Sequence, residues 1–546
     1  MTSLFAAADQ SNLLPLIATG VFFIILLGIA AWGMTKTKTT DDFFLGGRTL
    51  GPWILGISYG TAYFSAVVFI GFAGQYGWLC SYKSFWAGIM NGIVGSLLAW
   101  LVLGKPTRTM TRRLNASTMP EFFVKRFQSN GMKIFGALII FIFLLPYSAG
   151  VFAGLTYLFQ EVFHVSMTTA LTVVVAITGL YLVFGGYKAT ARIDFLQGMI
   201  MFFGVLVMVI FVLRYFSGIE GVNGVGDAIA KSTQYYHERL EGTRSAVQTN
   251  PFKPIPGVLF WSVVFMTSVS PWGMPQMVHK YYAIKDEKQI KIGAVICCVF
   301  ALLVGGAAYF IGAFSHLLPE DVLQSTLLPD QSAIDVQKLV PTILVMALPN
   351  WFLAIVLLLI LSASMSTLCA LALTSSAALS IDLFKGYIAP KAPEKTQLHV
   401  FRICCAIFIV LSYLVALNNP TWIVALTSLC WGVVCGSFMA PYMYGIFWRG
   451  TTKAGAIAGM ASGALISNAL YWGVFFHSGA QVAKMYSPLI ASIAMVAPFL
   501  VVPVVSLCTK KYDPEFIANA FDKLPDKQQV EASAEKNDAK QEAANA

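Results

Sequence analysis

The sequence predicts an all-α protein that crosses a membrane many times. Of its 546 residues, 57% are hydrophobic and only 11% are charged, and the mean hydropathy is +0.71. A water-soluble chain normally has about a quarter of its residues charged. Apolar stretches of about 20 residues, the length that a helix needs to span a bilayer, recur along almost the whole chain.

Thirteen apolar segments are long enough to span the bilayer as helices. They lie at 12–34, 53–79, 82–104, 132–160, 167–186, 193–216, 257–281, 291–316, 341–380, 399–417, 421–447, 454–476 and 484–508. Loops rich in Lys and Arg, such as GGYKATAR and WRGTTK, fall on alternating sides of successive segments. Because basic loops stay in the cytoplasm and the number of segments is odd, we expect the N-terminus outside and the C-terminus inside.

Two polar regions lie outside the predicted membrane helices. Residues 217–256 form a long loop that is expected on the external side and can carry short helical structure of its own, and residues 512–546 form a cytoplasmic tail whose composition indicates a disordered or loosely helical chain. The net charge of +10 comes from short basic clusters between apolar segments, without a basic face that is interleaved with aromatic residues. The composition therefore does not indicate nucleic-acid binding, and no obligate protein partner is evident.

Two of the predicted helices contain residues that favour local unwinding. The segment 51–79 is rich in Gly, Ser and Thr, and the segment 257–281 contains the motif SPWGMP. Interrupted helices at corresponding places in two halves of a chain indicate a transporter site, because unwound carbonyls can coordinate a cation. The alternative is that Gly and Pro are simply common in membrane helices. Five helices counted from each interrupted helix give two inverted repeats, and the whole chain then divides into 1–50, 51–216, 217–256, 257–447, 448–511 and 512–546.

Hydroxyl side chains cluster in the apolar segment 341–380. Within the stretch LILSASMSTL, Ser366 and Thr367 place hydroxyls near the carbonyl of Ala363, which keeps a lone pair after its helical hydrogen bond. With two carbonyls from an unwound helix, these three neutral oxygens can complete a site for sodium, a hard cation that prefers oxygen. The alternative is that the hydroxyls bond the carbonyl four residues back or join neighbouring helices.

The scarcity of titratable groups within the apolar segments bears on the coupling ion. Proton-driven carriers generally need Asp, Glu or His inside the membrane. Here Glu161 and Asp194 both lie near the ends of predicted helices. Sodium is therefore favoured over protons as the coupling ion.

Several motifs together resemble the sodium/solute symporter family, whose members carry proline, pantothenate, monocarboxylates, sialic acid and sugars. The resemblance covers about residues 12–510 and rests on DDFFLGGRTLGPW, RRLNASTMPEFFVKRF, GGYKATARIDFLQG, GMPQMVHKYYAIKD, SASMSTLCALALTSSAALSIDLFK and PYMYGIFWRGTTKAGAIAGM. It implies a core of five plus five inverted-repeat helices, as in the leucine transporter, with one extra helix before the core and two after it. It also implies a cell-membrane protein that imports a small organic solute with sodium by alternating access.

The resemblance also assigns roles to individual residues. It places Asp194 near the cytoplasmic exit path of the ion, although the preceding residue is Ile193 and not the usual Thr. The alternative for Asp194 is an ion pair with Arg192 or a cap of its own helix. The five sodium ligands would be the backbone carbonyls of Thr61, Phe64 and Ala363 and the hydroxyls of Ser366 and Thr367.

Two positions distinguish the predicted solute site from that of the proline carriers. Tyr63 stands where those carriers have an acidic residue and Thr267 where they have Trp, which argues against proline itself. The segment from GMPQ to KYYAIKD is more similar to the pantothenate and monocarboxylate branches, so a small carboxylate is the favoured solute. The alternatives are an amino acid of the proline type or a sugar. The candidate contacts of the solute are Tyr63, Ser65, Tyr147, Thr267 and Trp272. For the aromatic residues among them, helix packing is the alternative role.

Two other classes of protein are disfavoured. The motif HLLPED gives His316 and Asp321 the spacing of a glycerolipid acyltransferase, but it lies in a predicted external loop without a supporting nucleophile or phosphate-binding element. A transporter-like sensor would need a signalling domain, and the tail after Cys508 is too short and polar for a kinase domain. The sequence therefore indicates a transporter and not an enzyme.

Overall fold

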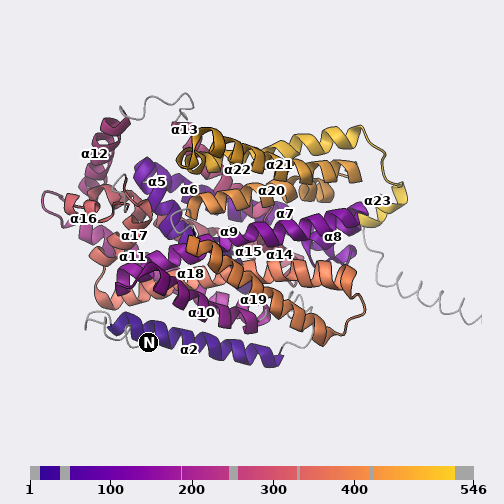
Figure 1. The fold of residues 1–546 in the computed structure, drawn as a ribbon, viewed down its shortest axis with the longest axis horizontal. Helices are drawn as coiled ribbons and strands as arrows, with labels where there is room; N and C mark the ends of the chain where they lie inside the picture. Colours follow the sequence, from indigo (N-terminus) through magenta and orange to yellow (C-terminus); the bar gives the residue numbers. More distant parts are fainter. Residues whose placement is uncertain are drawn as a thin grey trace, which may run out of the picture.

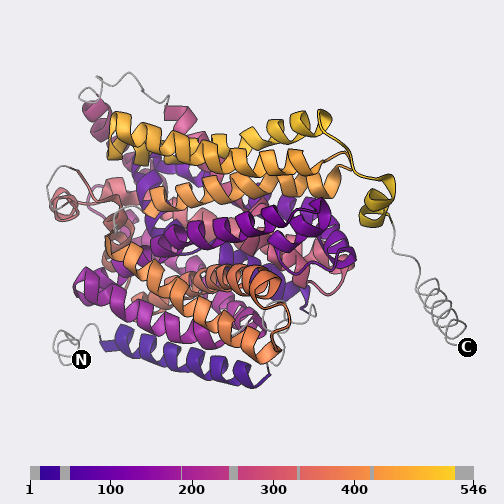
Figure 2. The ribbon, with the colours of Figure 1, turned by 45° about the vertical axis from the view of Figure 1, so that its right-hand side comes forward.

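The computed structural model describes residues 13–36, 50–185, 187–244, 256–328, 333–418 and 423–522. These residues are almost entirely helical, and among them there is no strand, only two isolated β-bridges. The long helices run side by side along the longest axis of the molecule (Figure 1). The helix α2 (Leu13–Lys36) lies along one side of the bundle, and α21 (Lys453–Ser478) and α22 (Ala480–Leu507) lie along the opposite side, as Figure 2 also shows.

Each of the thirteen predicted segments coincides with helical structure. Ten helical stretches of the described ranges are long and apolar enough to cross a membrane, and α2 and α10 contribute shorter apolar runs. The all-α, multi-pass class is therefore confirmed, while the number thirteen stays a prediction. Besides the helices named above, the elements that match predicted segments directly are α6 (Phe85–Met90), η5 (Asn91–Leu98), α7 (Ala99–Arg113), α9 (Asn130–Phe163), α10 (Met167–Gly185), α11 (Tyr187–Ser217), α15 (Ile290–Ala313), α19 (Glu394–Asn418) and α20 (Ile423–Phe447).

The first predicted interruption is present. The helix α4 (Pro52–Tyr63) ends where Phe64 adopts an extended backbone with φ −105° and ψ 127°. The chain resumes in η3 (Val67–Phe72), a π-helical stretch, and α5 (Ala73–Cys80). Carbonyls in the last turn of a helix lack helical partners. The interruption therefore presents backbone oxygens inside the bundle, because the end of α4 is buried.

The second predicted interruption is also present. The helix α13 (Pro256–Val269) passes into the short 3₁₀ turn η6 (Ser270–Trp272), and a new helix, α14 (Pro275–Ala283), follows. Pro275 has no N–H group to continue the helical ladder, and it disfavours helical geometry at the residue before it. Met274 accordingly has an extended backbone with φ −74° and ψ 121°.

Glycines allow the neighbouring helices to approach the first broken helix closely. A Cβ atom added to Gly77 of α5 would lie 2.2 Å from the carbonyl carbon of Gly312 in α15, so the two backbones touch. A Cβ atom added to Gly198 of α11 would lie 2.1 Å from Cγ2 of Ile57 in α4. Contacts between small residues are a common way for membrane helices to associate. They bring polar groups of α11 within reach of α4.

The largest difference from the predicted boundaries is in the segment 341–380. The predicted segment 341–380 is divided into α17 (Val336–Ala347) and α18 (Asn350–Ala377), because Pro349 cannot continue a helix and instead precedes the first turn of α18. α18 then continues as η9 (Ala378–Ile388), which is π-helical. The described part of the predicted external loop contains a helix, α12 (Val225–Arg244).

The C-terminal tail is ordered at its start. The short helix α23 (Pro514–Phe521) packs on the end of the bundle, where Arg113 donates to the carbonyl of Phe521 at 2.6 Å and Arg449 pairs with Asp522 at 2.8 Å. This short helix fits the loosely helical alternative for the start of the tail, and it contacts arginines that are distant in the sequence. Residues 523–546 lie outside the described ranges.

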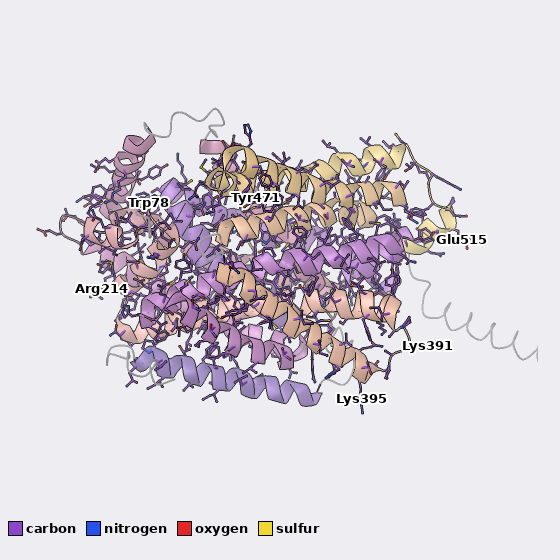
Figure 3. All side chains as sticks on the ribbon, in the orientation of Figure 1. Trp78, Arg214, Lys391, Lys395, Tyr471 and Glu515 are labelled. Atoms are coloured by element: carbon purple, nitrogen blue, oxygen red, sulfur yellow. The ribbon has the colours of Figure 1, made fainter. Side chains whose placement is uncertain are left out.

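Labelled side chains mark the two ends of the bundle. Lys391 and Lys395, which belong to a loop predicted to be cytoplasmic, lie at the same end as Glu515 of α23, whereas Trp78 and Arg214 lie at the other end (Figure 3). This placement agrees with the prediction that the loop and the tail share one side of the membrane. Which side is cytoplasmic stays a prediction.

Candidate functional site

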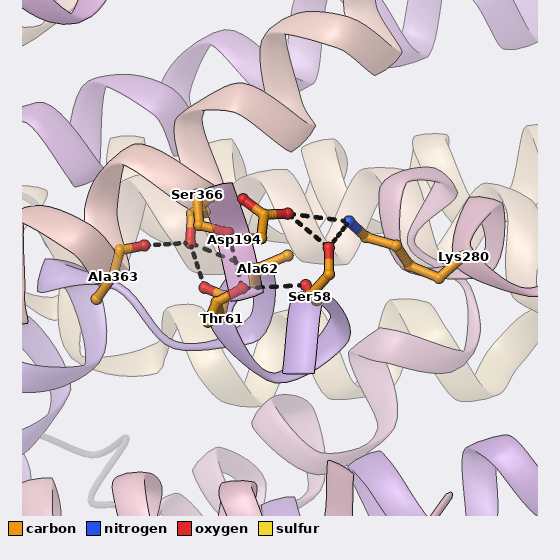
Figure 4. A network of polar contacts seen from close by, with 8 residues as sticks. Ser58, Thr61, Ala62, Asp194, Lys280, Ala363 and Ser366 are labelled. Carbon is orange, nitrogen blue, oxygen red and sulfur yellow. Dashed lines mark hydrogen bonds and ion pairs between the residues drawn. The ribbon is translucent and has the colours of Figure 1, made fainter. Parts of the chain in front are cut away.

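Oxygen atoms from α4 and α18 converge at the end of α4 (Figure 4). The Thr367 hydroxyl lies 3.4 Å from the carbonyl oxygen of Thr61 and 3.1 Å from that of Ala62. It also lies 3.1 Å from the carbonyl oxygen of Ala363 in its own helix. The Ser366 hydroxyl donates to the Thr61 hydroxyl at 2.9 Å. All five residues are buried, and we call them the oxygen cluster.

The geometry of α18 explains why these groups can bind a cation. Ala363 lies one helical turn before Thr367, so its carbonyl accepts the helical N–H and also faces the Thr367 hydroxyl. That hydroxyl has one hydrogen to donate and three carbonyl neighbours. At least two of these carbonyls therefore do not receive that hydrogen and keep a free lone pair near Thr367. Neutral oxygens in this arrangement suit a hard monovalent cation.

Four of the five residues predicted to bind sodium belong to the oxygen cluster. For the fifth, Phe64, the structure gives an N–H bond to the Gly60 carbonyl and no described hydrogen bond to α18, and its predicted role as a carbonyl ligand stays a prediction. A further carbonyl that faces Thr367 belongs to Ala62. The resemblance did not predict Ala62, and the position of the helix end at Tyr63 is the feature that brings its carbonyl to the cluster.

Ser364 of α18 contacts the chain that follows the interruption of the first broken helix. Its hydroxyl accepts a hydrogen bond from the N–H of Ala66 at 3.0 Å. The unbroken helix α18 therefore contacts α4 just before the interruption, through Thr367, and the chain just after it, through Ser364. The hydroxyls of the stretch SASMST fix the two ends of the break relative to each other.

A polar chain leads from the oxygen cluster to a buried ion pair (Figure 4). The Thr61 hydroxyl donates to the Ser58 carbonyl at 3.2 Å, and the Ser58 hydroxyl donates to a carboxylate oxygen of Asp194 at 2.5 Å. The Lys280 ammonium donates to the Ser58 hydroxyl at 2.7 Å and lies 3.6 Å from the same carboxylate oxygen. Helices α4, α11 and α14 therefore meet at one group of charged and polar atoms.

This ion pair changes the interpretation of Asp194. The structure pairs Asp194 with Lys280, a partner other than the Arg192 considered from the sequence, and Asp194 lies beyond the first turn of α11, so it does not cap that helix. Lys280 was not predicted as a site residue, because it stands in the basic stretch HKYYAIKDEKQIK, which is typical of a cytoplasmic loop. The aromatic pair Tyr281 and Tyr282 that follows it is the sequence signal for burial.

Two of the five predicted solute residues join the two broken helices. The Tyr63 hydroxyl at the end of α4 donates to the carbonyl of Thr267 in α13 at 2.5 Å. The Thr267 hydroxyl donates to the Val263 carbonyl, four residues earlier, at 2.8 Å. That local bond is the alternative expected for helical hydroxyls. Both residues are buried, so the link lies inside the bundle.

The other three predicted solute residues make separate contacts. The Ser65 hydroxyl accepts from the N–H of Val67 at 3.2 Å, and the indole of Trp272 donates to the carbonyl of Val94 at 2.9 Å. Tyr147 packs edge-on against Trp431, with 5.6 Å between the ring centroids. This contact is the helix packing that was the alternative role for the aromatic residues. No hydrogen bond of the described chain joins these three to Tyr63, and their solute role stays a prediction.

The fold and the site together define a class of protein. Interrupted membrane helices whose free carbonyls face hydroxyls of an unbroken helix are the arrangement of an ion-coupled secondary transporter. The chain belongs to the sodium:solute symporter family, whose family model matches residues 43–463. Sodium is therefore the coupling ion, and the chain is a transporter and not an enzyme.

Individual relatives agree with this assignment. The sodium/proline symporter of Haemophilus influenzae is 29% identical over 92% of this chain and 95% of its own length. The osmoregulated proline transporter OpuE of Bacillus subtilis is 29% identical over 84% of this chain and 88% of its own length. Among solved structures, the substrate-bound, outward-open state of a Na⁺-coupled sialic acid symporter matches with a TM-score of 0.71 at 15% identity. That match covers 92% of this chain and 99% of the symporter and shows a shared fold.

The comparisons confirm the predicted family, coupling ion and transport class. They do not support the predicted preference for pantothenate or another carboxylate, since the relatives described above are proline transporters. Of the solutes considered from the sequence, the amino-acid alternative is the better supported.

Proposed function

We propose that the protein imports a small amino acid of the proline type together with sodium. The support is the similarity to proline transporters over most of the chain. Tyr63 and Thr267 replace an acidic residue and a Trp of the proline carriers, so the pocket is expected to rank solutes differently. Proline is the first solute to test, with other small zwitterions beside it.

The oxygen cluster is the single observation that carries the sodium part of the proposal. The carbonyls of Thr61, Ala62 and Ala363 and the hydroxyls of Ser366 and Thr367 come from two helices and are all buried. These neutral oxygens can replace the water shell of sodium without a carboxylate ligand. Bound sodium would hold the end of α4 against α18.

The hydrogen bond between Tyr63 and Thr267 connects the proposed sodium site to the proposed solute pocket. Sodium that orders the end of α4 also orders Tyr63, and the Tyr63 hydroxyl holds the carbonyl of Thr267 in the second broken helix. Ser65, Tyr147 and Trp272 remain the further candidate contacts of the solute. Because linkage is reciprocal, sodium should tighten solute binding by the same factor by which solute tightens sodium binding.

Alternating access completes the proposed mechanism. The repeats 51–216 and 257–447 would move relative to each other around the site, with the N-terminus outside and the C-terminus in the cytoplasm. Sodium and solute bind from outside, and the ion then leaves toward the cytoplasm past Asp194. The sodium gradient drives accumulation because sodium favours the state that binds solute.

Uptake into liposomes tests this proposal. Purified protein is reconstituted, an inward sodium gradient is imposed, and accumulation of radiolabelled proline is measured against a potassium control and protein-free liposomes. We expect accumulation that follows the sodium gradient and that small zwitterionic amino acids inhibit. Uptake that is independent of sodium contradicts the coupling. Inhibition by pantothenate or lactate but not by amino acids shows that the carboxylate alternative is correct.

A further inference from the structure

Lys280 is a buried charge for which the proposed transport cycle has no role so far. It is 1% exposed, and its partner Asp194 is 3% exposed. Lysine is almost never fully buried unless an acidic group compensates its charge. The Ser58 hydroxyl joins the pair, because it accepts from Lys280 and donates to Asp194. The ammonium is therefore held at a defined place by both charge and hydrogen bonding.

Asp194 lies between the Lys280 ammonium and the oxygen cluster (Figure 4). One carboxylate oxygen contacts Ser58 and Lys280, and the other, although buried, makes no hydrogen bond of ordinary geometry. Ser366 of the oxygen cluster is close enough to interact with the carboxylate. A cation in the oxygen cluster and the Lys280 ammonium therefore interact with the same negative charge.

We infer that Lys280 is a tethered cation that sets how tightly the neighbouring site holds sodium. The inference rests on the proposed function, because it requires sodium to bind in the oxygen cluster. While the ammonium stays beside Asp194, the pair is neutral overall and attracts a further cation only weakly. When the ammonium is absent, the carboxylate keeps its full charge in a region of low dielectric constant, where charges interact strongly.

The position of Lys280 in the fold connects this effect to transport. Lys280 lies on α14, the part of the second broken helix that follows its interruption. A movement of α14 that withdraws the ammonium from Asp194 strengthens sodium binding, and its return weakens sodium binding and favours release. Lys280 is thus a positioning residue that couples the second broken helix to an ion held by the first.

Variants at the two charged positions test the inference because the expected effects have opposite signs. Lys280→Met leaves Asp194 unbalanced and should lower the sodium concentration for half-maximal binding by about tenfold. Asp194→Asn leaves the ammonium unbalanced and should raise that concentration by about tenfold. The double variant is again neutral and should stay within about threefold of the parent protein. Binding of radioactive sodium to the purified protein gives these values directly.

Two lysine variants control for the side chain itself. Lys280→Arg keeps the charge and should change sodium binding by less than Lys280→Met does. Lys105→Met removes a lysine whose side chain is 70% exposed and should leave sodium binding unchanged, since water and salt screen an exposed charge. Equal effects of Lys105→Met and Lys280→Met would show that the buried position is not special, and would overturn the inference.

The remaining outcomes separate this inference from the proposed sodium site. Shifts of Lys280→Met and Asp194→Asn in the same direction indicate a purely structural role and overturn the inference. If neither single variant folds, the double variant provides the test. A change of about tenfold or more in its half-maximal sodium concentration, in either direction, contradicts the charge balance. If Thr367→Ala weakens sodium binding but the charge variants do not shift it, only the inference fails. If Thr367→Ala binds sodium normally, the proposed site fails and the inference with it.

Discussion

Removal of the Thr367 hydroxyl tests the sodium site most directly. Thr367→Ala deletes one of the five oxygens of the cluster and takes away the group that faces the carbonyls of Ala62 and Ala363, each 3.1 Å away. A contact between a polar group and a charged one contributes about 1.5–3 kcal/mol. Since about 1.4 kcal/mol corresponds to a factor of ten, sodium affinity should fall by roughly ten- to a hundredfold.

A matched control is available on the same helix. Ser376 is buried in α18 and donates to the carbonyl of Ala372, four residues back, at 2.6 Å. Ser376→Ala therefore removes a hydroxyl and an i−4 hydrogen bond, as Thr367→Ala does, but outside the oxygen cluster. Each variant should lose about 0.5–1.5 kcal/mol of stability from that local bond. Only Thr367→Ala should change sodium affinity.

The assay is proline uptake into liposomes as a function of sodium concentration. The half-maximal sodium concentration is compared among the parent protein, Thr367→Ala, Ser366→Ala and Ser376→Ala, at equal amounts of folded protein. Both cluster variants should require more sodium while their uptake at saturating sodium is partly preserved. If Thr367→Ala and Ser366→Ala keep the sodium dependence of the parent, the oxygen cluster is not the sodium site.

Two further substitutions address the coupling and the packing. Tyr63→Phe keeps the ring but removes the hydrogen bond to the Thr267 carbonyl. Saturating sodium should therefore lower the half-maximal solute concentration by less in this variant than in the parent protein. If sodium lowers it equally in both proteins, this bond does not transmit coupling. Gly77→Ala should destabilise the protein by about 3 kcal/mol or more, because the added Cβ would lie 2.2 Å from the backbone of Gly312. Gly473→Ala, where nothing lies within 4 Å of the added atom, should not lower the melting temperature, and equal melting temperatures for the two glycine variants would contradict the packing argument.

The helices of this protein were predictable because their signal is local. A helix needs about 20 apolar residues to cross a bilayer, and that length can be counted in any one segment. The two interruptions were predictable as regions, since Gly, Ser, Thr and Pro in an apolar helix weaken it locally. The residue at which α4 ends was not, because it depends on how α11 and α18 pack there. This explains why the Ala62 carbonyl, which the resemblance did not name, lies near Thr367.

The buried ion pair could not be predicted from any one segment. Ser58, Asp194 and Lys280 come from three helices that are far apart in the sequence, and each residue alone has an ordinary interpretation. Lys280 resembles part of a basic loop, and its burial is compensated by the carboxylate of Asp194, which comes from a distant helix. The order of α23 has the same origin, because the arginines that hold it lie in other parts of the chain.

One short segment of α4 connects all the proposed elements of coupling. Within residues 58–63, Ser58 contacts the ion pair with α14, Thr61 and Ala62 contribute to the oxygen cluster with α18, and Tyr63 bonds to α13. This segment therefore touches both parts of the second broken helix and the unbroken helix at once. Sodium bound at the proposed site would fix the segment against α18 and thereby also its distance from α13 and α14. Packed helices move as rigid elements with few discrete arrangements. A shift of this segment on sodium binding would therefore change the solute pocket and the surroundings of Lys280 together.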